Sequence, residues 1–196
     1  MTIDRTPAGN CGRCTETHES EETYNFKINK LMKFTTDRLL IEPLSENDTD
    51  FILELVNTDG WLKFIGSRNI NSKTDAIAYI QKINGNQNIT YWTVKLIKTK
   101  VSIGIITFIK RDYLEYNDIG FAFLSKFSKK GFAFEATQKV LESLIENKKI
   151  TNILATTIPE NINSITLLEK LGFYFDKKIE IDNEILHIYK NEIESK

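Results

Sequence analysis

The stretch Phe121–Ala136, FAFLSKFSKKGFAFEA, joins a predicted strand to a predicted helix. Its first four residues are apolar, as in a buried strand, and apolar residues recur at helical spacing from Ala133 onward. A polar connection with three lysines lies between them and ends at Gly131. Glycine at the start of a helix lets backbone N–H groups surround an anion, and the helix dipole favours negative charge there. The stretch therefore predicts a phosphate-binding loop; the alternative is an ordinary strand–turn–helix with solvated lysines.

Composition limits the class of protein. The chain has 196 residues, 41% hydrophobic and 27% charged, which are ordinary values for one globular domain with or without a tail. The formal net charge of -1 disfavours nonspecific binding to nucleic acid, which needs a basic surface. No apolar run approaches the roughly 20 residues of a membrane span, and no signal-peptide pattern opens the chain. We therefore expect a cytoplasmic protein that binds neither nucleic acid nor membrane.

Both cysteines lie in a polar leader, residues 1–32. Cys11 and Cys14 form a Cys-x-x-Cys pair, a pattern that can bind zinc or take part in thiol exchange. Zinc normally takes four ligands, and His18 is the only obvious third. We therefore favour a disordered or added extension and expect no metal site. The folded domain is predicted to start after Met32 and to span residues 33–196.

The rest of the chain alternates patterns typical of strands and helices. Strands are predicted at 36–43, 89–97, 101–109, 117–124, 150–158, 173–181 and 185–189. Helices are predicted at 45–56, 72–83, 131–147 and 163–171, and Trp61–Ile65 is predicted to be irregular. Gly104, inside an apolar strand, indicates a bulge or a close approach of the backbone. The strands at 89–124 should pair antiparallel, whereas the crossover at Gly131 should make two strands parallel, so the prediction is one α+β domain.

Four short phrases stand in order along this domain. They are Thr36–Ile41 (TDRLLI), Asp118–Phe121 (DIGF), Lys130–Ala136 (KGFAFEA) and Asn161–Phe173, which contains NINS and LEKLGF. Together they resemble the opening strand, fourth strand, pyrophosphate loop and following motif of the Gcn5-related N-acetyltransferase (GNAT) superfamily, and more closely of its ribosomal-protein (RimJ/RimL) branch. The resemblance spans about residues 36–193. It implies a mixed, mostly antiparallel sheet of about six or seven strands, splayed at one parallel pair and flanked by about four helices.

The resemblance implies acetyl-CoA as cosubstrate and no metal. The pyrophosphate would bind amides at the helix start, and the pantetheine arm would follow the strand edge between the splayed strands. The residues implied to contact acetyl-CoA are Phe121, Ala122, Phe123, Lys129, Lys130, Gly131, Phe132, Ala133, Phe134, Asn161 and Ser164. The loop departs from the family pattern at Ser128, which replaces glutamine or arginine, and at Phe134, which replaces a small residue.

The implied reaction is transfer of an acetyl group to a primary amine. An amine attacks only when it is neutral, so a base is useful. Asp118 and Glu115 are the candidate carboxylates, each acting through a water relay. Asp118 is the first candidate, because its match to the family phrase places it on the central strand. The alternative for both is a solvated acid at the end of a strand.

The oxyanion and the departing thiolate need donors. A strand N–H near Phe123 or Leu124 would stabilise the oxyanion. Many relatives place a tyrosine acid where this chain has Leu168, which leaves Ser164 as the candidate acid. The alternative for Ser164 is a role in capping the helix that follows Asn161.

Aromatic side chains are the candidates for binding the amine, although such spacings are also typical of a core. The candidates are Trp61, Phe64, Tyr91, Trp92 and Tyr189, with Arg68 or Arg111 offering charge. The acceptor stays open between a protein N-terminus and a small-molecule amine, and a monomer or homodimer is expected. A domain that binds acyl-CoA without turnover, as a sensor or partner module, is the alternative function.

Overall fold

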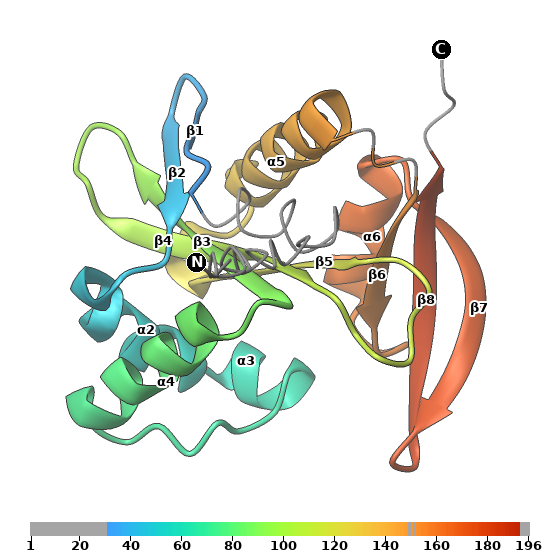
Figure 1. Cartoon of the computed structure of the whole chain (residues 1–196), viewed down its shortest axis with the longest axis horizontal. Coiled ribbons are helices and arrows are strands. Elements are labelled where there is room, and N and C mark those ends of the chain that lie inside the picture. The colour runs from blue at the N-terminus through green and yellow to red at the C-terminus, as the bar shows by residue number, and fades with distance from the viewer. Residues whose placement is uncertain (1–30, 149, 151, 193–196) are drawn as a thin grey trace, which may run out of the picture.

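The computed structural model describes residues 31–148, 150 and 152–192. Eight strands form one sheet in the order β1-β2-β3-β4-β5-β6-β8-β7 (Figure 1). The strands are β1 Phe34–Thr35, β2 Leu39–Pro43, β3 Ile89–Leu96, β4 Ser102–Ile109, β5 Asp118–Phe123, β6 Asn152–Thr157, β7 Tyr174–Ile181 and β8 Glu184–Glu192. The helices are α2 Thr49–Val56, α3 Asp59–Phe64, α4 Lys73–Gly85, α5 Phe132–Lys148 and α6 Ile162–Lys170. Residues 1–30 of the leader, with Cys11 and Cys14, lie outside the described residues, so the predictions made for them stay predictions.

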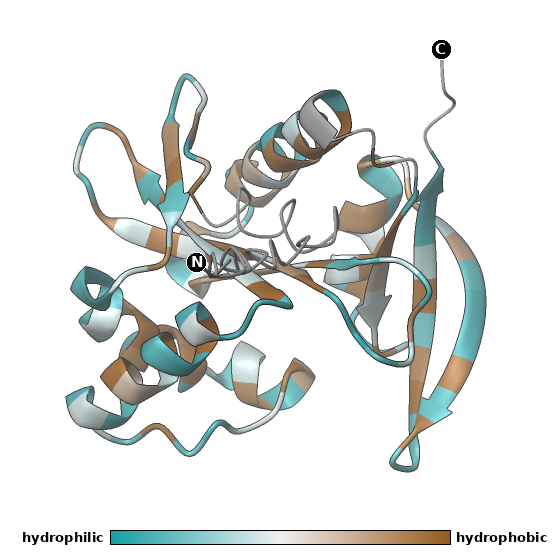
Figure 2. Cartoon of the chain, in the orientation of Figure 1, coloured by the Kyte–Doolittle hydropathy of each residue, from teal (hydrophilic) through white to brown (hydrophobic). Residues whose placement is uncertain are grey.

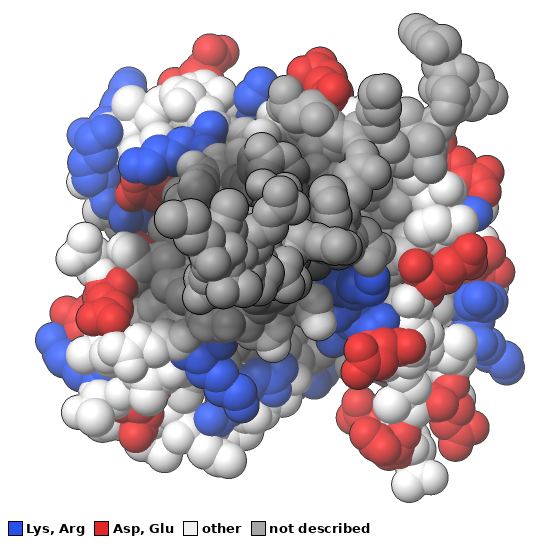
Figure 3. Space-filling view, viewed as in Figure 1, with Lys and Arg blue, Asp and Glu red and all other residues white. Residues whose placement is uncertain are grey.

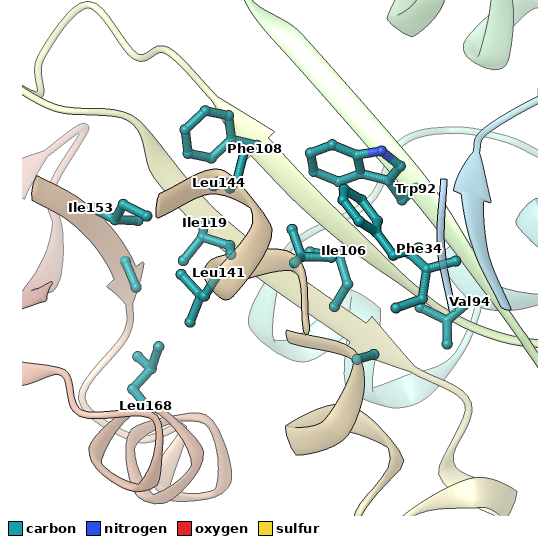
Figure 4. Packing of buried hydrophobic residues seen from close by; sticks show 14 of the residues in the cluster. Phe34, Trp92, Val94, Ile106, Phe108, Ile119, Leu141, Leu144, Ile153 and Leu168 are labelled. Carbon is teal, nitrogen blue, oxygen red and sulfur yellow. The ribbon is translucent and has the colours of Figure 1, made fainter. Parts of the chain in front are cut away.

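Helices cover both faces of the sheet, and the apolar residues lie between the layers (Figures 1 and 2). On one face, Leu141 and Leu144 of α5 pack with Ile119 of β5 and Ile106 of β4 (Figure 4). On the other face, α2 and α4 enclose a second cluster that includes Ile80. Because β4 is covered on both faces, six consecutive residues in its middle are buried. The predicted α+β class is confirmed.

Local signals set the starts of the helices. Ser72 Oγ accepts a hydrogen bond from Asp75 N at 3.2 Å, and Asp75 Oδ2 accepts one from Ser72 N at 2.9 Å, which together form a capping box at α4. The same reciprocal arrangement links Ser45 and Asp48 in the short 3-10 turn before α2. Both caps lie at the first residues of the helical segments predicted at 45–56 and 72–83.

The segment Trp61–Ile65 is mostly helical, not irregular as predicted. The hydroxyl of Thr58 accepts a hydrogen bond from Trp61 N at 3.3 Å and so caps α3. The Trp61 side chain is only 4% exposed and packs in the cluster of α2 and α4. Burial of one large aromatic side chain therefore stabilises a helix too short for a periodic pattern to reveal.

The parallel pair occurs where it was predicted, between β5 and β6. Asp118 and Leu154 are in register, and no further pair of these two strands is in register within the described ranges. The strands therefore separate beyond this point, as the resemblance implied. The sheet exceeds the predicted six or seven strands because the two-residue β1 pairs with β2 through Phe34 and Ile41.

Gly104 combines a bulge with a close approach. The β3–β4 register shifts between Val94, opposite Gly104, and Lys95, opposite Ser102, which leaves one extra residue on β4. A Cβ atom at Gly104 would lie 2.3 Å from Cδ1 of Phe123, so only glycine leaves room for that ring in this position. This packing fixes Phe123 beside the gap between β5 and β6.

The β7–β8 hairpin forms the far edge of the sheet. Acidic and basic side chains both lie over it, and acidic ones gather toward its turn (Figure 3). Across the described ranges, no helix combines the length and apolar character needed to cross a bilayer.

Candidate active site

The turn before α5 has a backbone suited to binding an anion. Lys129 and Gly131 lie in the left-handed region, with φ of 60° and 78°, and α5 begins at the next residue. Left-handed residues within a turn direct successive N–H groups toward one side and form a concavity for an anion. Residues 128–131 are exposed, so this turn lies at the protein surface.

Helix α5 adds its own donors to this turn. Glu135 N donates to Gly131 O at 3.0 Å, and the N–H groups before it have no acceptor inside the helix. α5 is 17 residues long, so its dipole places partial positive charge at this end. Lys129 and Lys130 add positive charge beside the same donors.

An ion pair between Arg38, which directly precedes β2, and Glu135 of α5 holds the loop in place. Arg38 Nε donates to Glu135 Oε2 at 2.7 Å, and Nη2 of the same guanidinium also contacts this oxygen. Arg38 Nη1 donates to Lys130 O at 3.2 Å, and the guanidinium lies over the Phe132 ring, 4.6 Å from its centroid. Thr36 Oγ1 donates to Glu135 Oε1 at 2.5 Å. Burial raises the pKa of Glu135, but the hydrogen bonds from Thr36 and Arg38 outweigh it and lower the pKa overall.

The β5 edge beside β6 presents unpaired backbone groups. Leu124 N donates to Ile103 O of β4 at 2.9 Å, so even-numbered residues of β5 face β4 and odd-numbered residues face β6. Phe121 and Phe123 therefore direct their N–H and C=O groups into the gap. Ala122, predicted to contact the cosubstrate, directs its own toward β4. Of the two oxyanion donors predicted, Leu124 N–H is thus occupied and Phe123 N–H faces the gap.

Asp118 lies at the point where β5 and β6 separate. Its side chain is 3% exposed, and Oδ2 contacts Arg111 Nε at 2.6 Å. Oδ1 accepts a hydrogen bond from Thr156 N at 2.9 Å. Burial raises the pKa of Asp118, and the guanidinium and the Thr156 groups oppose that rise. The base role predicted for Asp118 stays a prediction, and these contacts compete with it; Glu115 is exposed on the preceding loop.

Asn161 and Ser164 lie at the start of α6, the helix that follows β6 in the chain. The side chain of Asn161 accepts a hydrogen bond from Ser164 N at 3.3 Å, which makes Asn161 the helix cap. The Ser164 side chain is half-buried, and its hydroxyl has no partner within the described part of the chain. The capping role thus belongs to Asn161, and the hydroxyl of Ser164 stays available for chemistry.

The five aromatic candidates do not line one pocket. Trp61 and Tyr91 lie on the α2–α4 face, where burial raises the pKa of Tyr91 and a neighbouring tyrosine, Tyr79, adds to the rise. Trp92 and Tyr189 belong to the core on the α5 face, at 0% and 5% exposure. Adjacent strand residues point to opposite faces, which separates Tyr91 from Trp92. Phe64 is half-buried at the end of α3.

Comparison with known proteins identifies the family. A family model described as an acetyltransferase (GNAT) domain matches residues 38–174. This chain is a GNAT acetyltransferase. YnaD of Bacillus subtilis, an uncharacterised N-acetyltransferase, is 32% identical over 157 residues, which cover 78% of this chain and 91% of YnaD.

Solved structures agree with this family. A GNAT-family acetyltransferase from Bacillus anthracis has a TM-score of 0.71 at 27% identity and covers 82% of this chain and 98% of its own. Spermidine N-acetyltransferase from Vibrio cholerae, solved with CoA and spermine, has a TM-score of 0.69 and covers 80% of this chain and 96% of its own. Its 16% identity shows a likeness of fold alone.

Two features of this GNAT domain were missed by the sequence analysis. Arg38 and Glu135 were quoted only as parts of phrases, and no role was predicted for Thr156. A glutamate in the first turn of a helix that should bind an anion is unfavourable unless a cation compensates it, and this was the available signal for Glu135. The shorter of the two hydrogen bonds from Thr156 to Asp118 uses its backbone N–H, which carries no sequence signal.

Proposed function

We propose that this chain transfers the acetyl group of acetyl-CoA to a primary amine by direct attack of the amine on the thioester. One observation carries the proposal. The unpaired edge of β5 leads directly into the loop whose left-handed residues, Lys129 and Gly131, open the amides of α5 to solvent. A strand edge for an amide-bearing arm and an anion site for a pyrophosphate thus lie on one continuous stretch of chain.

The residues present fit acetyl-CoA. The amides from Lys129 to Phe134 suit a pyrophosphate because backbone donors do not depend on the side chain, so Ser128 need not supply one. The groups of Phe121 and Phe123 that face the gap suit the amides of a pantetheine arm, which would bind as an added strand does. Arg38 supports the site by neutralising Glu135, whose charge would otherwise repel a phosphate.

The proposed reaction needs side chains only for proton transfer. The amine nitrogen forms a bond to the carbonyl carbon, the carbon–sulfur bond breaks, the amine loses a proton and the thiolate gains one. α-Amino groups have a pKa of about 8 and lysine of about 10.4, so an N-terminal amine needs less help from a base. Phe123 N–H is the proposed oxyanion donor and Ser164 the proposed acid. Glu115 is the proposed base, and assignment to the RimJ/RimL branch is part of the proposal.

Titration with CoA tests the binding half of the proposal. Wild-type protein should bind CoA saturably, measured by calorimetry. Gly131→Val should abolish measurable binding, because a β-branched residue does not tolerate φ of 78°. Gly85→Val is the matched control, since no atom lies within 4 Å of a Cβ at Gly85 and its φ is not positive. Absence of CoA binding by the wild type would reject the proposal.

A screen of amines tests the catalytic half. Thiol release from acetyl-CoA should depend on the amine and should disappear in Gly131→Val. Peptides with free N-termini, polyamines and amino acids distinguish the acceptor classes. Saturable CoA binding without acetylation of any amine would favour the sensor alternative. We expect the protein to act in the cytoplasm as a monomer or homodimer, which subcellular fractionation and sedimentation would check.

A further inference from the structure

β5 and β6 begin to pair as parallel strands and then separate. Leu154 N donates to Asn117 O at 2.9 Å, the hydrogen bond expected for the register of Asp118 with Leu154. Donors on a parallel strand recur at every second residue, so Thr156 N–H is the next donor of β6 toward β5. In a continuous ladder its acceptor would be Ile119 O, two residues beyond Asn117.

A side chain takes the place of that backbone acceptor. Thr156 N donates to Asp118 Oδ1 at 2.9 Å, and Thr156 Oγ1 donates to Asp118 Oδ2 at 3.4 Å. A buried N–H without an acceptor destabilises a fold, so strands that part at this point need a substitute. The Asp118 carboxylate supplies it without drawing β6 up to Ile119. Ile119 O therefore stays directed into the gap.

Arg111 compensates the buried negative charge of Asp118. Asp118 is 3% exposed, and a carboxylate so deeply buried is unstable without a cation. Arg111 Nε lies 2.6 Å from Oδ2, leaving Oδ1 for Thr156. Burial lowers the pKa of Arg111, but attraction to Asp118 raises it overall, as expected of a mutually stabilised pair.

We propose that Asp118 is a positioning residue that ends the β5–β6 ladder and holds open the gap that takes the pantetheine arm, with Arg111 as its counterion. The inference rests on the proposed function, because the gap serves an arm only if acetyl-CoA binds. It gives Asp118 a different task from the base role predicted from the sequence. Both carboxylate oxygens already accept hydrogen bonds, and the side chain is too deeply buried to pass a proton readily to solvent.

Binding of two different ligands can be measured to test the gap and the anion loop separately. CoA carries the pantetheine arm, whereas its nucleotide half lacks the arm and probes the loop alone. In Asp118→Ala the affinity for CoA should fall about tenfold or more, equivalent to one or two hydrogen bonds. The affinity for the nucleotide half should stay within about twofold of wild type, a difference too small to reflect a lost contact. Equal CoA affinity in Asp118→Ala and wild type would overturn the inference.

A second variant covers the case in which Asp118→Ala unfolds. Arg111→Gln/Asp118→Asn removes both charges but keeps an oxygen for Thr156 N–H, so CoA affinity should stay within about threefold of wild type. Loss of CoA binding by this folded variant would contradict the inference. A fall of kcat by about 10²-fold or more at unchanged CoA affinity, with loss of the acidic limb of the pH profile, would instead establish Asp118 as the base. A wild type that binds neither ligand would reject the proposed function itself.

Discussion

Two arginine–carboxylate pairs hold the two halves of the candidate site, and they differ in burial. Arg38–Glu135 braces the loop at the start of α5, with side chains 49% and 21% exposed. Arg111–Asp118 lies at the strand junction, with side chains 33% and 3% exposed. In each pair a threonine adds a hydrogen bond to the carboxylate. The pKa is nonetheless lowered for Glu135 and raised for Asp118.

The comparison shows that burial decides how much an arginine–carboxylate pair contributes to stability. An exposed ion pair stabilises a fold by at most about 1 kcal/mol, because water competes for both partners. Breaking a buried pair leaves a charge that water cannot reach, and this costs about 3–5 kcal/mol. Stability should therefore depend strongly on the junction pair, whereas the loop pair should affect mainly ligand binding.

Removing the junction guanidinium should have the largest effect. Arg111→Met leaves Asp118 buried without a counterion and should lower the free energy of unfolding by about 3–5 kcal/mol, measured by urea denaturation. Arg111→Met/Asp118→Asn should recover most of this loss, because no unpaired charge remains. A loss below about 1 kcal/mol in the single variant would place this pair with the exposed ones.

Overpacking at Gly104, next to the point where β5 and β6 separate, should have the second-largest effect on stability. A methyl group at Gly104 would lie 2.3 Å from the Phe123 ring, so Gly104→Ala should displace the ring and cost about 1–3 kcal/mol of unfolding free energy. Gly60→Ala is the matched control, since nothing lies within 4 Å of its Cβ. CoA affinity should fall in Gly104→Ala and not in the control. Equal stability of the two variants would show that Phe123 relaxes freely.

Removing the loop guanidinium should affect binding more than stability. Arg38→Gln should lower the free energy of unfolding by at most about 1 kcal/mol. CoA affinity should fall about tenfold, because Glu135 then presents an uncompensated charge beside the anion site. Arg38→Lys should restore only part of the affinity, since an ammonium lacks the planar fork that reaches both Glu135 and the Lys130 carbonyl. Unchanged CoA affinity in Arg38→Gln would show that the Arg38–Glu135 pair does not contribute to CoA binding.

The smallest expected effect is the change in stability on lowering the pH. The contributions of Glu135 and Asp118 to this change should have opposite signs. Glu135 has a pKa below its ordinary value of 4.5, so its stabilising contribution is present above that value and is lost as pH falls through the folded pKa. Asp118 has a pKa above its ordinary value of 3.8, so its contribution is present below that value and is lost as pH rises through the folded pKa. Glu135→Gln should therefore flatten the stability profile below about pH 4.5, measured by thermal unfolding. A steeper acid loss in this variant would contradict the direction given for Glu135.

The sequence was sufficient where a signal is local. The predicted helix at 72–83 and the glycine before α5 gave helix starts that the structure confirms, and Gly104 predicted the irregularity of β4. Helix α3 was missed because its stability comes from burial of Trp61 among residues distant in sequence. β1 was missed because two residues make no pattern.

The candidate site was predicted less completely, for a physical reason. The loop could be found because glycine and lysines stand next to a helix start. The partners of Asp118 could not, because Arg111 reaches it from a loop and Thr156 uses its backbone. Trp92 and Tyr91 are neighbours in sequence but lie on opposite faces of the sheet, where each packs with a different hydrophobic cluster. The residue types alone could not separate the candidate amine-binding side chains from those of the core.

The brace on the loop also has a consequence for folding order. Arg38 and Glu135 are 97 residues apart, so the contact that shapes the anion site has a high contact order. Such contacts slow folding, because the entropy of closing a long segment is lost before the contact stabilises it. During synthesis, β2 must wait for α5 to emerge and dock. In a nascent chain, β3, β4 and β5 therefore emerge before α5 can complete this loop.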